Sequence, residues 1–293
     1  MDESGQNSPV LFQSSDEALQ YLRHLGQSSD DNIDLGEAAL ALGLIFLPGL
    51  HIDRYRQHLH KLAEHVQEEY LSRLRLKEKD DLHLRVRILR KIIHEAHGYQ
   101  GDDKNYDDIQ NANLIRVIER RKGLPVSLGI IYIILARKMS WVCDGLSFPG
   151  HFLVRMEKES ERIILDPFKE GREMNAAELR QLLKSIVGQN AELSHSFYNA
   201  VSNREILVRL ENNLKKRLIE GEDYGGAIRV AEAISAFSPE EYRIYLDKGV
   251  LHAKLGQNQQ AVLALELYIA KTPHAKEKQH ANLLLQQIKS SLD

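Results

Sequence analysis

Two pairs of residues near the end of this 293-residue chain repeat at one spacing. Ala227 and Ala261 are 34 residues apart, and Pro239 and Pro273 are also 34 residues apart. Each alanine lies twelve residues before its proline, inside an apolar segment that the proline-containing turn ends. Because a small alanine lets two helices approach closely and proline forces a turn, this spacing predicts stacked helix pairs from Arg204 onward.

The spacing resembles the tetratricopeptide repeat, whose period is 34 residues. Only about two units fit, and the first unit lacks glycines at the positions equivalent to Gly249 and Gly256 of the second. Residues 275–292 are expected to form a capping helix that covers the last open face. We therefore predict an all-α, tetratricopeptide-like helical repeat region over 201–293.

Hydrophobic periodicity predicts an α+β domain over 31–200, preceded by an acidic, partly disordered segment over 1–30, with disorder expected at 1–9. Apolar residues recur at steps of three and four in segments that we expect to be helices, namely 16–25, 35–46, 51–72, 82–96 and 114–121. A helix over 126–138 is apolar almost all round and must be buried, and Pro125 suits its first position. Strands are expected over 141–143, 151–156 and 162–165, which would form a small antiparallel sheet.

The charge balance is nearly neutral, with 39 Lys and Arg against 42 Asp and Glu and a net charge of −3. This balance disfavours a large nucleic-acid surface and a polybasic membrane anchor, since both need excess positive charge. The one cysteine, Cys143, rules out an intramolecular disulfide and favours a reducing compartment. No run of about 18 apolar residues and no secretory signal pattern is present, so we expect a cytoplasmic protein without nucleic-acid or membrane partners.

Three polar residues interrupt the apolar central region in a pattern that suits acyl chemistry. Ser127 lies in the first turn of the buried helix, His151 opens an expected strand, and Asp166 ends the next strand. Adjacent antiparallel strands lie about 4.8 Å apart, so the histidine can hydrogen-bond the aspartate, which would fix the imidazole tautomer. A helix N-terminus facing this pair favours an anionic nucleophile.

Each of these residues also has a purely structural interpretation. Ser127 can bond a backbone group in its helix turn, His151 can be a satisfied structural histidine, and Asp166 before a proline can form a turn. Asn111 and Asn113 either cap the helix over 114–121 or line a cleft. The residues alone leave these alternatives open.

The motifs around these residues are Leu114-Ile-Arg-Val-Ile-Glu-Arg-Arg-Lys-Gly-Leu-Pro-Val-Ser-Leu-Gly, Phe148-Pro-Gly-His-Phe-Leu-Val and Leu165-Asp-Pro-Phe. They resemble the SirB-type proteins of the transglutaminase-like superfamily. This resemblance covers residues 30–290 and implies a papain/transglutaminase-like core joined to tetratricopeptide-like helices. The wider superfamily uses a triad of cysteine, histidine and aspartate on amide bonds. His151 and Asp166 match its last two members, whereas the nucleophile position falls on Ser127.

The absent thiol decides the functional prediction. A thiol with a pKa of ~8.5 can be ionised by a helix N-terminus and a neighbouring imidazolium, whereas a serine hydroxyl is far less acidic. We therefore predict a non-catalytic or weakly active, regulatory module that binds a protein or peptide partner through a peptide cleft and a helical-repeat docking surface. The alternative is a Ser-dependent amide hydrolase or acyltransferase that uses Ser127, His151 and Asp166.

Other polar residues have simpler expected roles. Cys143 lies in an expected strand away from any helix N-terminus, so we expect a buried, inert thiol. The charged run over 116–122 is expected to be a solvated helix face, with docking of an acidic partner as the alternative. Seven of the thirteen histidines lie between residues 51 and 97 and are interpreted as surface residues. No motif with metal-ligand spacing or phosphate-binding glycine loop is present, so no metal and no cofactor is expected.

Overall fold

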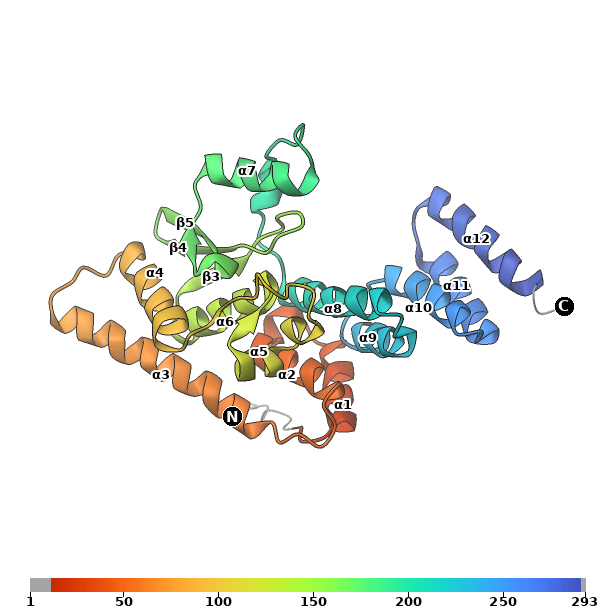
Figure 1. Ribbon diagram of the computed structural model, residues 1–293, viewed down its shortest axis with the longest axis horizontal. Helices are drawn as coiled ribbons and strands as arrows, with labels where there is room; N and C mark the ends of the chain where they lie inside the picture. The colour runs from red at the N-terminus through yellow and green to blue at the C-terminus, as the bar shows by residue number, and fades with distance from the viewer. Residues whose placement is uncertain (1–11, 291–293) are drawn as a thin grey trace, which may run out of the picture.

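The computed structural model describes residues 12–290 (Figure 1). The expected disorder of residues 1–9 and the end of the expected capping helix, 291–292, lie outside the described residues. The α-helices are α1 (Ser15–Leu25), α2 (Leu35–Ile45), α3 (Asp53–Arg75), α4 (Leu82–Arg90), α5 (Leu114–Arg120), α6 (Pro125–Lys138), α7 (Ala176–Val187), α8 (Asn203–Glu220), α9 (Tyr224–Phe237), α10 (Arg243–Lys254), α11 (Asn258–Lys271) and α12 (Ala275–Ser290).

Shorter elements connect these helices. A π-helical turn, η2 (Lys91–Ala96), continues α4, and the short 3-10 helices are η1 (Asp30–Asn32), η3 (Ile109–Ala112), η4 (Pro167–Lys169) and η5 (His195–Tyr198). The strands are β1 (Gln100–Gly101), β2 (Lys122–Gly123), β3 (Val142–Gly145), β4 (Val154–Lys158), β5 (Glu161–Asp166) and β6 (Arg172–Glu173).

Helix α6 lies at the centre of the fold, as its apolar sequence predicts. Pro125 occupies its first turn, where the missing N–H costs no helical hydrogen bond. Every residue from Pro125 to Ala136 is buried. Helices α2, α3, α5 and α8 pack around α6, and the sheet that begins with β3 covers it on the side of α7 (Figure 1). The predicted α+β arrangement is confirmed.

Four antiparallel strands form this sheet in the order β3-β4-β5-β6, while β1 and β2 make a separate parallel pair. Along β4, the buried Val154 and Met156 alternate with the partly exposed Arg155 and Glu157. This alternation is typical of a strand with one face on the core. The small antiparallel sheet could therefore be predicted from the sequence.

The prediction that His151 opens a strand is wrong. Strand β4 begins three residues later, at Val154. Gly150 has a φ of +68°, so the chain is still turning when it reaches His151. Arg209 on α8 donates to the carbonyl oxygens of Phe148 and His151, so a side chain takes these backbone acceptors in place of a neighbouring strand.

Helices α8, α9 and α10 share a core with the elements that precede them in the chain. One hydrophobic cluster extends from Phe12 to Leu251 and includes Leu210 of α8 and Ile234 of α9. Helix α1 packs against α2 and α9 and contributes the fully buried Leu22. The described part of the acidic N-terminal segment is thus packed into the fold.

The 34-residue spacing corresponds to stacked helices. Ala227 in α9 and Ala261 in α11 are both fully buried, and the prolines twelve residues later lie in the turns after these helices. Gly249 lets α10 approach α11 closely, because a Cβ there would lie 2.7 Å from a leucine Cγ of α11. Helix α12 packs on α11. The predicted helical repeat with a final covering helix is confirmed.

Replacing Gly26 by alanine is expected to lower the free energy of unfolding by about 1–3 kcal/mol. A Cβ at residue 26 would lie 2.2 Å from the carbonyl oxygen of Ala236 in α9, and this backbone atom cannot rotate away. Urea denaturation followed by circular dichroism measures the change. Gly225→Ala in the first turn of α9 is the matched control, because the nearest atom to its Cβ would be 3.8 Å away. Equal stability of the two variants would contradict the packing of α1 on α9.

Candidate functional site

His151 and Asp166 form a hydrogen-bonded pair, as predicted. Nε2 of His151 lies 2.9 Å from Oδ1 of Asp166, and their side chains are 13% and 5% exposed. Asp166 ends β5, and its carboxylate also accepts the backbone N–H of Phe168 in η4. Because Nε2 contacts the carboxylate, Nδ1 is the ring nitrogen left to face another group. The carboxylate of Asp166 can therefore fix the orientation of the imidazole ring.

Ser127 directs its hydroxyl elsewhere. Its side chain is fully buried, and Oγ donates to the carbonyl oxygens of Asn111 at 2.8 Å and Leu124 at 3.0 Å. Among residues 12–290, no hydrogen bond joins Ser127 to His151. A hydroxyl has one proton, and both of its acceptors here are backbone carbonyl groups, one in η3 before α5 and one directly before α6. This geometry matches the structural interpretation of Ser127 in the first turn of its helix.

Two aromatic rings continue from the histidine towards the surface. The ring of Phe168 packs edge-on against His151, with centroids 6.4 Å apart. Tyr106 packs edge-on against Phe168 at 5.6 Å and is 39% exposed. Burial raises the pKa of the Tyr106 hydroxyl, with Asp166 among the smaller causes. The aromatic rings thus form a continuous row of contacts, from the partly exposed Tyr106 through Phe168 to His151, whose partner is Asp166.

Helix α8 forms another side of this site. Nη2 of Arg209 donates to the carbonyl oxygen of His151 at 2.6 Å, and its guanidinium lies over the ring of Phe152. Two turns later on α8, Arg217 donates to the carbonyl oxygen of Tyr106 at 3.0 Å and lies over that ring. Helix α8 therefore holds both the turn that carries His151 and the loop that carries Tyr106.

Sequence reasoning missed these four neighbours of the pair: Tyr106, Phe168, Arg209 and Arg217. Phe168 belongs to the Leu165-Asp-Pro-Phe motif, which is a signal that could have found it. Tyr106 lies in a polar, turn-rich segment, and the arginines lie in an ordinary amphipathic helix, so nothing local marks them.

The asparagines and the charged run build the loop beside the site. Asn113 caps α5 by accepting the N–H groups of two residues in its first turn. Asn111 accepts from Arg120, whose guanidinium also lies 3.0 Å from the buried carboxylate of Asp102. Arg121 contacts Tyr99 through its guanidinium. The expectation of a solvated charged face is wrong for Arg120 and Arg121, because tertiary partners more than a turn away in sequence cover them.

The interpretation of the histidines as surface residues is also wrong for part of the group. His94 is buried between the carbonyl oxygen of Tyr99 and the hydroxyl of Tyr132. The rings of His58, His65 and His97 lie together, and burial followed by the charge of Arg121 lowers the pKa of His58 to about 4. Within residues 12–290, no group of three or more His, Cys, Asp or Glu side chains is arranged to hold a metal ion.

Cys143 is fully enclosed in β3. Burial, and to a smaller extent Asp144, raises the pKa of its thiol above the usual range. A thiol of this kind stays protonated and unreactive, which agrees with the predicted inert cysteine. In the part of the chain that the structure describes, no helix has the length and apolar character that crossing a membrane requires.

Comparisons with known proteins match both halves of the chain. Residues 53–212 match the family described as the transglutaminase-like superfamily, and residues 214–289 match the tetratricopeptide repeat. A UPF0162 protein of Xylella fastidiosa is 29% identical over 85% of this chain and 88% of its own length. A UPF0162 protein of Vibrio cholerae is 29% identical over 83% of this chain and 88% of its own length. Protein SirB1 of Salmonella typhimurium is 29% identical over 55% of this chain and 60% of its own length.

Proposed function

This chain belongs to the transglutaminase-like superfamily, and from that premise we propose that it is a non-catalytic, regulatory protein-binding module. The surface beside His151 would hold a peptide segment of the partner, and the tetratricopeptide-like helices would present a docking surface. We place this module in the cytoplasm, because that compartment keeps an unpaired cysteine reduced.

The proposal rests on the burial and the hydrogen bonds of Ser127. A nucleophile must reach both its base and its substrate, but this side chain is fully buried and its hydroxyl proton points to backbone carbonyls. Moving the hydroxyl to His151 would break these hydrogen bonds inside the core. Serine also lacks the acidity that lets a thiol ionise beside an imidazolium. Burial and chemistry therefore both oppose acyl transfer at this position.

The second candidate function is a Ser-dependent amide hydrolase or acyltransferase. The intact pair of His151 and Asp166 favours it, because this pair has the contact that a general base needs. The same pair also has a structural use, since Asp166 caps η4 and its partner histidine fixes the turn before β4. The pair by itself is thus compatible with either function.

Labelling of Ser127 separates the two functions. We expect no reaction of the wild-type chain with a fluorophosphonate probe, and no cleavage of fluorogenic peptide amides, because Oγ is enclosed. Intact-mass spectrometry and peptide mapping measure the first result. Ser127→Ala, which lacks the hydroxyl, gives the background. Stoichiometric labelling at Ser127 that disappears in His151→Ala would establish the hydrolase and contradict our proposal.

A further inference from the structure

A groove of about 490 Å³ lies along α8 and the start of α10. Its floor is one face of α8, on which Glu205, Arg209, Asn212 and Lys216 recur at steps of three and four. Ser238, Glu241 and Arg243 line the side towards α10. Figure 1 shows α8 between the sheet with α7 on one side and α10–α12 on the other. The groove and the candidate site share Arg209, which lines the groove and donates to the carbonyl oxygen of His151.

The groove carries more positive than negative charge. Arg204, Arg209, Lys216 and Arg243 line it, against Glu205 and Glu241. The carboxylate of Glu205 already has a hydrogen-bond partner, because it accepts the backbone N–H of Ser202 in the capping box of α8. A chain with a net charge of −3 thus places a local excess of cations in one concave surface.

Three of these cations are guanidiniums that form no ion pair within the described part of the chain. Within residues 12–290, neither Arg204 nor Arg209 nor Arg243 forms an ion pair with Asp or Glu. Arg209 uses Nη2 on two carbonyl oxygens, and burial lowers its pKa because no anion compensates the lost hydration. Nη1 of Arg204 is enclosed and has no hydrogen-bond partner. A carboxylate in the groove would add charge-assisted hydrogen bonds to Arg209 and Arg243, whereas the enclosed Nη1 of Arg204 lies out of its reach.

The remaining lining suits an extended polypeptide. Asn212 is exposed on the groove, and among the described residues its amide has no hydrogen-bond partner, so it can donate to and accept from a peptide backbone. The face of α8 from Glu205 to Lys216 is ~16 Å long, which about five extended residues would cover. Among the residues that the structure describes, no aromatic ring lines the groove, whereas single-stranded nucleic acid is bound by stacking bases on such rings.

We propose that this groove binds an acidic peptide segment in an extended conformation, and that the same segment continues past Arg209 to His151 and Asp166. This inference rests on the proposed protein-binding function and names the chemistry of its partner. Arg209 is the shared contact, because it lines the groove and holds the backbone of His151. Carboxylates of the peptide pair with Lys216, Arg243 and Arg209 in turn.

Fluorescence anisotropy of the full chain tests the groove. The probe is a fluorescein-labelled peptide of alternating glutamate and serine, about twelve residues long so that it exceeds the α8 face. We expect it to bind, and the same peptide with glutamine for glutamate not to bind. The double variant Lys216→Gln/Arg243→Gln should weaken binding about tenfold, since it removes two charge-assisted contacts. Both side chains are exposed, and within residues 12–290 neither forms an ion pair or hydrogen bond with another helix, so the variant should fold.

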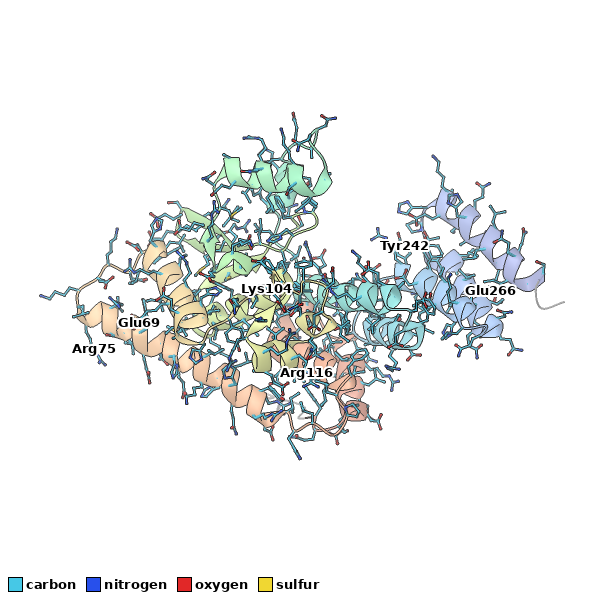
Figure 2. The ribbon with its side chains drawn as sticks, viewed as in Figure 1. Glu69, Arg75, Lys104, Arg116, Tyr242 and Glu266 are labelled. Carbon is cyan, nitrogen blue, oxygen red and sulfur yellow. The ribbon has the colours of Figure 1, made fainter. Side chains whose placement is uncertain are left out.

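Arg75→Gln is the matched control for loss of charge. Arg75 lies at the far end of α3 from the repeat helices (Figure 2), and the variant should bind the peptide as the wild type does. A benzophenone placed at either end of the peptide tests the second half of the proposal. One of the two peptides should cross-link to residues 103–108 or 148–153. Cross-links confined to other segments would refute a single ligand that spans both places.

Other outcomes overturn the inference in distinguishable ways. Equal binding of the glutamate and glutamine peptides would refute the acidic partner and leave a protein-binding role intact. No binding of either peptide would also refute it, while the labelling of Ser127 tests the proposed function independently. A fluorescein-labelled single-stranded RNA that binds more tightly and depends on Lys216 and Arg243 would assign the groove to nucleic acid instead.

Discussion

Replacing Arg120 by methionine is expected to lower the free energy of unfolding by about 3–5 kcal/mol. Its guanidinium lies 3.0 Å from the carboxylate of Asp102, whose side chain is 1% exposed, and 3.1 Å from Asp108. It also donates to Asn111, the residue whose carbonyl oxygen accepts from the buried serine. Without it, the partners that remain for the buried carboxylate among the described residues are the backbone N–H of Asn105 at 3.3 Å and Lys122 at 4.0 Å, so its lost hydration is largely uncompensated.

Urea denaturation measures this loss against a neighbouring arginine. Arg116→Met removes a more exposed partner of Glu119 from the same helix and should cost no more than about 1 kcal/mol. Adding Asp102→Asn to Arg120→Met should recover part of the stability, because the unpaired buried charge is then gone. If Arg120→Met costs no more than Arg116→Met, the ion pair does not hold the loop that carries Tyr106.

Replacing Glu211 by glutamine is expected to stabilise the chain at alkaline pH. Glu211 on α8 is buried, its Oε2 has no hydrogen-bond partner, and Lys215 beside it pairs with Asp247. Burial raises the pKa of this carboxyl to about 8, an effect that the charge of Lys215 only partly offsets. The carboxyl is therefore protonated in the folded chain at neutral pH and ionised in the unfolded chain.

The sign of the pH dependence follows from this difference. Between the ordinary pKa near 4.5 and the folded pKa of about 8, the folded chain holds one more proton than the unfolded chain. Glu211 thus makes stability fall by roughly 1.4 kcal/mol per pH unit as the pH rises through this window. Glu211→Gln carries no titrating group, so its advantage should be near zero at pH 4 and reach a few kcal/mol above pH 8.

Urea denaturation at a series of pH values checks this expectation. Glu220→Gln, at the exposed end of the same helix, is the control and should leave the slope of stability against pH unchanged. Parallel curves for wild type and Glu211→Gln would mean that Glu211 is ionised in the folded chain. Lys215 would then form an ion pair with Glu211 and no longer with Asp247.

Much of the secondary structure could be predicted from the sequence because its signals are local. Pro125 followed by an apolar run specifies a buried helix within a few residues. Ala227 and Ala261 mark helices that must approach others closely, and the spacing between these two alanines indicates a helical repeat. The alternation along β4 marks a strand with one buried face.

The candidate site was predictable only in part. The contact of His151 with Asp166 follows from their positions before and at the end of adjacent strands, and the motif supported it. The turn at His151 did not follow, because Arg209 on a later helix takes its carbonyl oxygen. The hydroxyl of Ser127 points to Asn111 for a similar reason, since the loop before α5 brings that carbonyl to it.

The sequence by itself thus determined most of the helices and the central strands, that the last helices repeat, and that His151 and Asp166 can meet. Only the tertiary structure decided that Ser127 is enclosed and that α8 supplies Arg209 to the site. Periodicity and turn residues act through neighbours in the chain, whereas the partner of a buried polar group is chosen by whichever donor or acceptor packing brings near. For Arg209 that acceptor is 58 residues away in the chain, where no local pattern points to it.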